Sequence, residues 1–440
     1  MNLHRIQENI ESQKRDSSLP MRAMIAYFLI FTSVSSAYVF YKFHYFAYIY
    51  FTISIFSYYL VYFGYSIIGK NYNNRKIIVY ATKEGMNLSI IVLSIIGIFL
   101  IYYDRTAIRG IDYSGIGIAA ARAEINRLGE RGGVLSVVGN LLSVSIYLPF
   151  INLIFDWEKW DKRKYLIGML VIFGLAGLTY LTAGRTVILI AIALVSTAIL
   201  GRGVTGRPLL PNFLSVRRVF ALAILTIFIF GLIFSLRAEA FGAANSAEYL
   251  GQLCVHLSQP APLVMMKCSD AVSSTGIPFL DDFLNYGTAV ILYAVHIVWI
   301  GDVIAVDTNF GQITTFIGLQ DLFLSRFGFV LQSTNYDGYF IPASHGMIFD
   351  FGYIATAIFL IISGLIWKIS QYLMMNGSIT FGRVIFCYVG AALILSVLIS
   401  ASNLPFYVLS LGIILVMLTV QRVFIRRPSQ GAMQPPRTPI

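Results

Sequence analysis

Apolar runs of bilayer length recur along this sequence, and they constrain its fold more than any other feature. An α-helix needs about 20 predominantly apolar residues to cross the hydrocarbon core of a membrane. Ten such runs predict an all-α polytopic membrane protein with about ten transmembrane helices. The predicted spans are 23–42, 46–68, 86–103, 134–155, 165–184, 186–201, 219–236, 349–367, 384–402 and 405–421.

Composition supports this class of protein and excludes others. Apolar residues make up 57% of the chain, charged residues make up 12%, and the mean hydropathy is +0.75. These values are typical of polytopic membrane proteins and exclude an ordinary soluble domain. The polar leader before Met24 lacks the short apolar region and cleavage site of a removable signal peptide. The sequence carries no nucleic-acid-binding motif, so its net charge of +11 needs another explanation.

The distribution of basic residues supplies that explanation and predicts the orientation of the chain. With a cytoplasmic N-terminus, the inside segments carry 22 of the 32 lysines and arginines but only 7 of the 21 acidic residues. Short cytoplasmic loops of membrane proteins are enriched in basic residues in this way. The inside segments are 1–22, 69–85, 156–164, 202–218, 368–383 and 422–440. Two sizeable loops, 104–133 and 237–348, are then expected outside.

This orientation divides the chain into four parts. Residues 1–236 hold the N-terminal membrane helices and the first outward loop. Residues 237–348 form a large outward loop, which should fold because it is rich in aromatic and aliphatic residues. Residues 349–426 hold the C-terminal membrane helices. Residues 427–440 are rich in proline and polar residues and are expected to form a disordered cytoplasmic tail.

One apolar segment, 287–305, allows two interpretations. It is long enough to span the membrane, but a second crossing would then have to carry Asp321 and Arg326 in its interior. We therefore favour a helix that lies in the outer interface or dips into it, with His296 and Asp302 on its wetter side.

Arginines in or next to the outward segments are the clearest chemical signal. A guanidinium group grips phosphate through two parallel hydrogen bonds and keeps its charge at any physiological pH. Arg185 lies in a short hairpin between two apolar helices, where a permanent cation needs a partner or a ligand, or else anchors a helix end. Arg122 and Arg237 each open an Arg-Ala-Glu tripeptide. The other outward arginines are Arg105, Arg109, Arg127, Arg131 and Arg326.

Two further residues in the large loop and at its end are candidates for a site. His345 lies between serine and glycine, where an exposed histidine could orient or deprotonate a hydroxyl, or could simply bond a backbone carbonyl. Asp350 could act as a base, but a helix N-cap or an anion at a helix N-terminus is the simpler interpretation.

Cysteine and histidine spacings predict neither a metal site nor a cofactor. No pair of these residues has the spacing of metal ligands, and the acidic residues are scattered. Cys254 and Cys268 both lie in the outward loop, in a compartment that permits a disulfide. Two separate buried thiols are the alternative.

Several of these residues resemble motifs of the O-antigen polymerases, which are Wzy-type polymerases of oligosaccharide repeat units. Arg122 and Gly133 resemble an Arg-x10-Gly loop motif, and the hairpin 182–185 resembles the Ser/Gly-Arg turn shared with the O-antigen ligases. Asn335-Tyr336 and the motif 349–352 resemble the end of the large periplasmic loop of the polymerases. The order of spans and loops is similar as well.

The second loop departs from the family's pattern, because the position eleven residues after Arg237 is Glu248 and not glycine. The two outward loops are therefore not equivalent.

This resemblance implies a GT-C-like membrane glycosyltransferase in the bacterial inner membrane, with its active site facing the periplasm. Such enzymes take undecaprenyl-pyrophosphate-linked oligosaccharides, transfer the growing chain to the incoming repeat unit and release undecaprenyl pyrophosphate. Membrane lipids, a polysaccharide chain-length regulator and a flippase are the implied partners, and no cofactor is implied. The catalytic residues would be Arg185, Arg237 and His345, and the substrate-binding residues Arg122, Gly133, Arg326, Tyr336 and Asp350.

Two other functions stay open at this point. An O-antigen ligase differs mainly in its acceptor, and the 349–352 motif favours the polymerase. A transporter or flippase of lipid-linked sugars predicts internal repeats and charged or broken segments at mid-membrane, which the sequence does not show.

Overall fold

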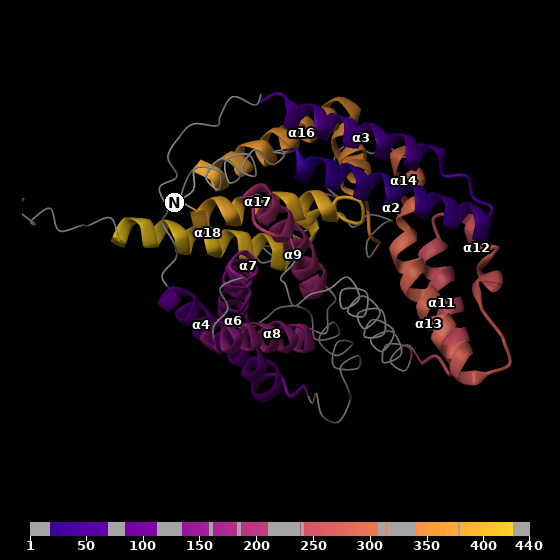
Figure 1. Ribbon diagram of the computed structural model, residues 1–440. Coiled ribbons are helices and arrows are strands. Elements are labelled where there is room, and N and C mark those ends of the chain that lie inside the picture. Colours follow the sequence, from indigo (N-terminus) through magenta and orange to yellow (C-terminus); the bar gives the residue numbers. More distant parts are fainter. Residues whose placement is uncertain are drawn as a thin grey trace, which may run out of the picture.

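The computed structural model is mostly helical and has no strand over the residues that it describes, which are 18–68, 84–111, 134–157, 162–182, 186–209, 238, 242–306, 314, 339–376 and 379–425 (Figure 1). The helices of at least nine residues are α2 (Leu19–Phe43), α3 (Tyr48–Ser66), α4 (Glu84–Tyr103), α6 (Val134–Ser143), α7 (Tyr147–Phe155), α8 (Lys162–Thr182), α9 (Thr186–Val204), α11 (Ser246–Ser258), α13 (Pro278–Val295), α14 (Ile297–Val306), α16 (Ala343–Asn376), α17 (Ile379–Leu395) and α18 (Pro405–Ile425).

The predicted spans coincide with helices, apart from 219–236, which lies outside the described residues. Within the described part of the chain, seven helical segments are long and apolar enough to cross a membrane, and α17 and α18 are shorter apolar helices. The chain is therefore a multi-pass membrane protein. The span expected at 384–402 instead begins at Ile379 and ends at Leu395, because a turn follows it before Pro405 opens α18.

Helix starts follow local sequence signals. Pro20 and Pro278 lie in the first turns of α2 and α13. Proline has no N–H, and in the first turn of a helix that group has no partner within the helix. Helix α11 begins after Asn245, whose side chain accepts a hydrogen bond from the Glu248 N–H (2.8 Å). The Glu248 carboxylate accepts in turn from the Ala244 N–H (2.7 Å). This reciprocal capping satisfies two donors that the helix itself leaves unpaired.

Helix α16 consists of two helical pieces joined at Gly352. The backbone there has φ 77° and ψ 175°, a conformation that is essentially restricted to glycine. The helix also starts at Ala343, six residues before the predicted span at 349–367. The segment 349–352 therefore forms a break within a helix and does not begin one.

Glycines bring α3 and α16 into close contact. A Cβ atom on Gly64 would collide with the carbonyl of Ile361, and one on Gly364 would collide with the carbonyl of Val61. Small residues allow membrane helices to approach in this way, because packing rather than water exclusion holds them together. Helices α3 and α16 consequently pack closely against each other.

Segments that the charge pattern assigns to the inside meet in one ion cluster. Asp156 follows α7 and accepts hydrogen bonds from Arg207 (3.0 Å) and Arg383 (3.4 Å), and Arg202 donates to the Phe155 carbonyl (2.5 Å). Burial raises the pKa of Asp156, but Arg383 and Arg207 outweigh burial and hold that pKa below its ordinary value. The end of α7, the end of α9 and the start of α17 therefore lie together, as the predicted topology requires.

Helix α14 lies across the ends of α2, α3 and α16 that the charge pattern assigns to the outside, which we call the outward ends. Its Trp299 contacts Phe43 at the end of α2, and its Gly301 packs against Tyr50 in the first turn of α3. Together with α13 it runs at a steep angle to α2 and α3 (Figure 1). This arrangement fits the interfacial interpretation of 287–305, although Pro278–Val306 is also long and apolar enough to span.

The expectation that His296 and Asp302 face water is wrong, because both side chains are buried. The N–H of Phe340 donates to His296 Nε2 (3.2 Å), and Nδ1 of the same ring bonds the Tyr293 carbonyl (2.9 Å). The contact between His296 and Phe340 places the residues just before α16 beside the junction of α13 and α14. Other helices cover the side of α14 that the sequence suggested would be wet.

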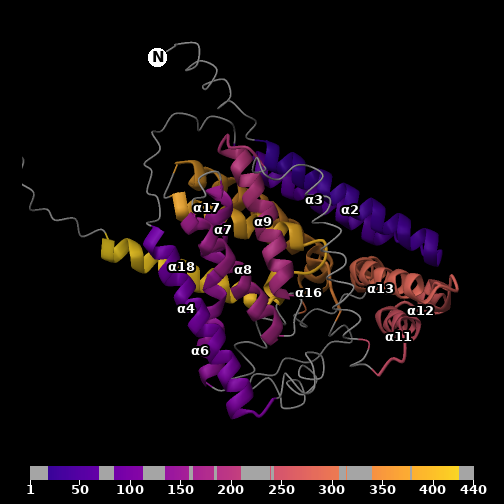
Figure 2. The same cartoon turned by 60° about the horizontal axis from the view of Figure 1, so that its bottom comes forward.

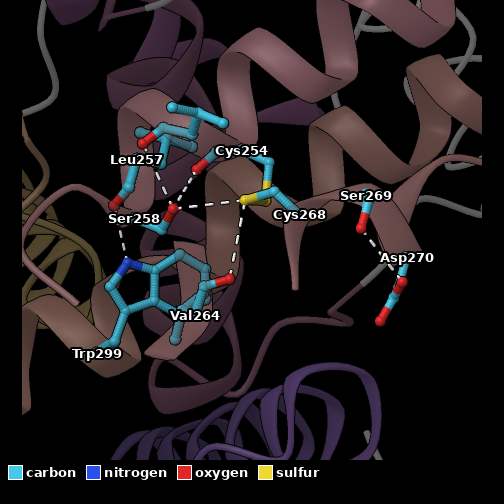
Figure 3. The surroundings of a disulfide bond; sticks show 9 residues. Cys254, Leu257, Ser258, Val264, Cys268, Ser269, Asp270 and Trp299 are labelled. Carbon is cyan, nitrogen blue, oxygen red and sulfur yellow. Dashed lines mark hydrogen bonds between the residues drawn. A yellow bond between two sulfur atoms is a disulfide. The ribbon is translucent and has the colours of Figure 1, made fainter. Parts of the chain in front are cut away.

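A disulfide joins Cys254 of α11 to Cys268, which opens a short 3-10 turn at Cys268–Ala271 (Figure 3). Of the two alternatives for these cysteines, the structure has the bridge. Helices α11 and α13 pack side by side around it, with the short helix α12 (Pro262–Met265) between them in sequence. We call the segment 246–295 the outer hairpin. Trp299 Nε1 donates to the Leu257 carbonyl (2.8 Å) and so ties the outer hairpin to α14.

Candidate functional site

Two of the eight candidate site residues, His345 and Asp350, lie in the described part of the chain. The other six lie outside it: Arg122, Gly133, Arg185, Arg237, Arg326 and Tyr336. Their predicted roles stay predictions, and the site can be built only from the elements that flank them.

His345 is enclosed by protein. Its side chain is 0% exposed, and its ring stacks on Tyr50 with 5.2 Å between the ring centroids. Nδ1 lies 3.2 Å from the Ser344 hydroxyl, and the far edge of the ring packs on Gly301. The expectation of an exposed loop histidine is therefore wrong, because α16 begins earlier than predicted and α3 and α14 cover the ring. In this arrangement the imidazole does not reach a sugar hydroxyl.

Asp350 holds a distant segment of the large loop. Its Oδ1 accepts hydrogen bonds from both the N–H and the hydroxyl of Thr314 (2.8 Å each). The side chain of Asn403 donates to the carbonyl of the same threonine (2.7 Å). Hence both backbone polar groups of the buried Thr314 are satisfied, one by a side chain of α16 and the other by a side chain of the 3-10 turn Ala401–Asn403. The N-cap interpretation is wrong, because Asp350 lies inside α16 and bonds another segment.

Asp302 has a structural role that the sequence analysis missed. Its Oδ1 accepts a hydrogen bond from the N–H of Tyr50 (2.5 Å), in the first turn of α3. The first N–H groups of a helix have no partner within the helix, so this carboxylate caps α3 from another part of the chain. The sequence did contain a signal for this role. Asp302 lies inside an apolar run, and a carboxylate in such a place needs a buried partner.

The ends of α4 and α8 meet on the outward side through Arg105. Helix α4 continues into a π-helical turn at Asp104–Ile108, and Arg105 in this turn donates to the Leu181 carbonyl near the end of α8. Arg109 follows, with its Nε 3.1 Å from Oδ2 of the buried Asp104. Turns of π-helix recur at functional sites. Arg105 therefore contacts the end of α8, and Arg185 follows Leu181 by four residues in the sequence.

A small polar cavity lies deeper, between α2, α3, α16 and the turn after α17. Its volume is about 20 Å³, and its polar lining comes from Ser54, Ser57, Tyr58, Ser344 and Ser396. A cavity of this size holds about one water molecule. It is too small for a sugar or a pyrophosphate, so it does not serve as the substrate site.

Metal binding finds no support in the described side chains, which contain no group of three His, Cys, Asp or Glu residues placed to hold an ion. The chemistry available in this part of the molecule is that of guanidinium and carboxylate groups at the outward helix ends. Comparison of the chain with protein-family models, curated proteins and solved structures found no match.

Proposed function

We propose that this chain is a membrane glycosyltransferase that polymerises lipid-linked oligosaccharide repeat units at the outer face of a bacterial inner membrane. The observation that carries the proposal is the turn after α4, where Arg105 donates to the Leu181 carbonyl near the end of α8 and Arg109 pairs with Asp104. Arg185 follows Leu181 by four residues in the sequence, so the proposal expects a third arginine near this end of α8. The family motifs at 122–133, 182–185 and 349–352 support the same proposal.

The proposed reaction is the transfer of a growing chain from undecaprenyl pyrophosphate to a new repeat unit. The bond between the anomeric carbon and the pyrophosphate oxygen breaks, and a bond from the acceptor hydroxyl oxygen to the same carbon forms. The hydroxyl proton leaves with the pyrophosphate. Negative charge accumulates on the departing phosphate oxygens, and preorganised guanidinium groups stabilise it there. Arg185 and Arg237 hold the pyrophosphate, and Arg122 positions one of the lipid-linked chains.

In this proposal His345 and Asp350 hold the structure around the site and take no part in the chemical step. His345 fixes the packing of α3 against α14, and Asp350 anchors Thr314. Both act on the large outward loop that carries Arg326 and Tyr336 and follows Arg237. In this proposal they are positioning residues.

Substitution of the two pyrophosphate-binding arginines tests the proposal. Arg185→Lys and Arg237→Lys keep the charge but lose the planar fork, so each should impair polymerisation, and alanine should impair it more. Loss of one preorganised donor lowers a rate by roughly 10²–10³-fold. Cells with an impaired polymerase should carry lipopolysaccharide capped with a single repeat unit, whereas loss of a ligase would leave no repeat at all.

Arg163→Ala is the matched control, because Arg163 is exposed on a segment assigned to the inside. It should leave the polymer ladder unchanged. Immunoblots must show that every variant accumulates normally. Full-length polymer with both Arg185→Ala and Arg237→Ala would exclude these residues and move the search to Arg105, Arg109, Arg127, Arg131 and Arg326.

A second candidate function, transport of lipid-linked sugars across the membrane, gains support from two observations. Helix α16 is broken at Gly352, and the span at 134–155 contains a 3-10 segment, Val144–Ile146, between α6 and α7. Transporters build their binding sites from such discontinuous helices. Purified protein in liposomes separates the two functions. A transporter moves a lipid-linked oligosaccharide between leaflets without lengthening it, and a polymerase lengthens it.

A further inference from the structure

The outer hairpin has a polar exposed face on α11. Glu248, Gln252 and His256 are all exposed and follow one another at intervals of four residues. Residues at this spacing lie on one side of a helix. That side is suited to water.

The chain from α12 to α13 has an exposed apolar face, with the exposed Lys267, Asp270 and Asp282 beside it. Its large apolar side chains are between 52% and 79% exposed at Leu263, Met266, Ile277, Phe279 and Phe283. Soluble surfaces rarely expose a contiguous apolar patch of this kind without a partner. The disulfide ties α11 to the chain after α12, so the two faces belong to one unit.

Helix α13 is apolar on two sides. Phe279, Phe283 and Ile291 lie on the exposed side at intervals of four and eight residues. Ala289 and Leu292 are buried on the side that packs against α11. The inner side is accounted for by the hairpin itself, and the outer side needs a separate apolar environment.

The position of α13 indicates what that environment is. Helix α13 leads directly into α14, which lies across the outward ends of α2, α3 and α16, and α13 also contacts α2. The turn between α2 and α3 exposes Tyr41, Phe46 and Tyr48, and aromatic side chains of this kind mark the interface between membrane and water. Figure 2 shows the outer hairpin below this end of α2 and α3. The apolar face of the hairpin thus continues the lipid-facing surface of the spans.

We propose that the outer hairpin binds the outward leaflet of the membrane, with the apolar face of α12 and α13 among phospholipid acyl chains and α11 facing water. A helix that lies in the interface buries its apolar side about 5–10 Å into the boundary between headgroups and acyl chains. Over its 18 residues, α13 would follow the membrane surface for about 27 Å. This inference does not rest on the proposed function.

Fluorescence quenching by brominated phospholipids tests the proposal on the full-length protein in liposomes. Phe279→Trp places a reporter on the apolar face, and Gln252→Trp is the matched control on the polar face of the same hairpin. The emission added by each tryptophan is obtained by subtracting the emission of the unsubstituted protein. Bromines near the glycerol end of the acyl chains should remove the emission added at position 279 and leave that at 252, which aqueous acrylamide should quench instead.

Three outcomes would overturn the proposal. Quenching at position 279 by acrylamide alone would place this face in water. Protection from both quenchers would mean that protein covers it, either a second copy or another partner. Strongest quenching by bromines at the bilayer centre would mean that the segment spans the membrane.

Discussion

At the scale of single residues, buried polar groups fix the outward ends of the helices. Asp302 caps α3 through the N–H of Tyr50, and Asp350 holds Thr314 by two hydrogen bonds. Hydrogen bonds to a charged acceptor are stronger than those between neutral groups, and a buried carboxylate left without them would destabilise the fold. Each carboxylate therefore joins segments that are remote in sequence.

Gly301→Ala should destabilise the protein, because the new Cβ would lie 2.8 Å from Cδ2 of Tyr50 and 3.1 Å from Cδ2 of His345. Overpacking of this kind costs about 1–3 kcal/mol. Gly287→Ala is the control, since a Cβ there meets no atom within 4 Å. The melting temperature of the purified protein should fall for the first variant and hold or rise for the second. Equal melting temperatures would mean that His345 is not packed on Gly301.

At the scale of secondary structure elements, the break in helix α16 lets its two pieces make different contacts. Its first piece carries His345 and Asp350 at the outward end, and its second piece packs tightly against α3 through Gly364. The break at Gly352 changes the direction between them. The break therefore allows Asp350 to reach Thr314 while the rest of the helix stays in the bundle.

Gly352→Ala should cost about 1–3 kcal/mol, because a Cβ is strained at this backbone conformation. Gly412→Ala in α18, where a Cβ meets open space, is the control. Thermal unfolding should separate the two variants. Unchanged stability in Gly352→Ala would show that α16 is not broken there.

The disulfide gives a prediction for the outer hairpin. Replacing Cys254 and Cys268 together by alanine should lower the stability of the hairpin by up to about 3 kcal/mol, because the bridge restricts a short loop in the unfolded chain. Protease added from the outside should then cut the hairpin sooner. Cys387→Ala is the control, since this buried cysteine is free. Alkylation of both hairpin cysteines without a reductant would show that the bridge is absent.

At the scale of the whole molecule, the two ends of the bundle differ in chemistry. At the end assigned to the inside, Arg207 and Arg383 bond Asp156, and Arg202 donates to the neighbouring carbonyl of Phe155. The opposite end carries the outer hairpin and the π-helical turn after α4. This asymmetry agrees with a topology in which basic segments stay in the cytoplasm.

Reporter fusions test this topology. Fusions after Gly133 and after Tyr249 should both report a periplasmic position, and a fusion after Lys164 should report a cytoplasmic one. A cytoplasmic signal at Tyr249 would contradict the orientation and, with it, the assignment of the arginines to the outer face.

The sequence by itself determined the membrane class, the position of the helices and the net charge at each end. These features depend on runs of neighbouring residues, whose hydrophobicity is the same wherever the run lies. The interpretation of 287–305 as an interfacial helix stays a prediction, because Pro278–Val306 is also long and apolar enough to span the membrane.

Only the tertiary structure decided which polar side chains are buried and what they bind. Asp302 and Tyr50 are 252 residues apart, and Asp350 and Thr314 are 36 apart. His345 looked exposed because glycine and serine flank it, yet α3 and α14 enclose it. The two cysteines could be paired only once the fold set the distance between them. Such contacts depend on the packing of whole helices, which no local pattern of residues encodes.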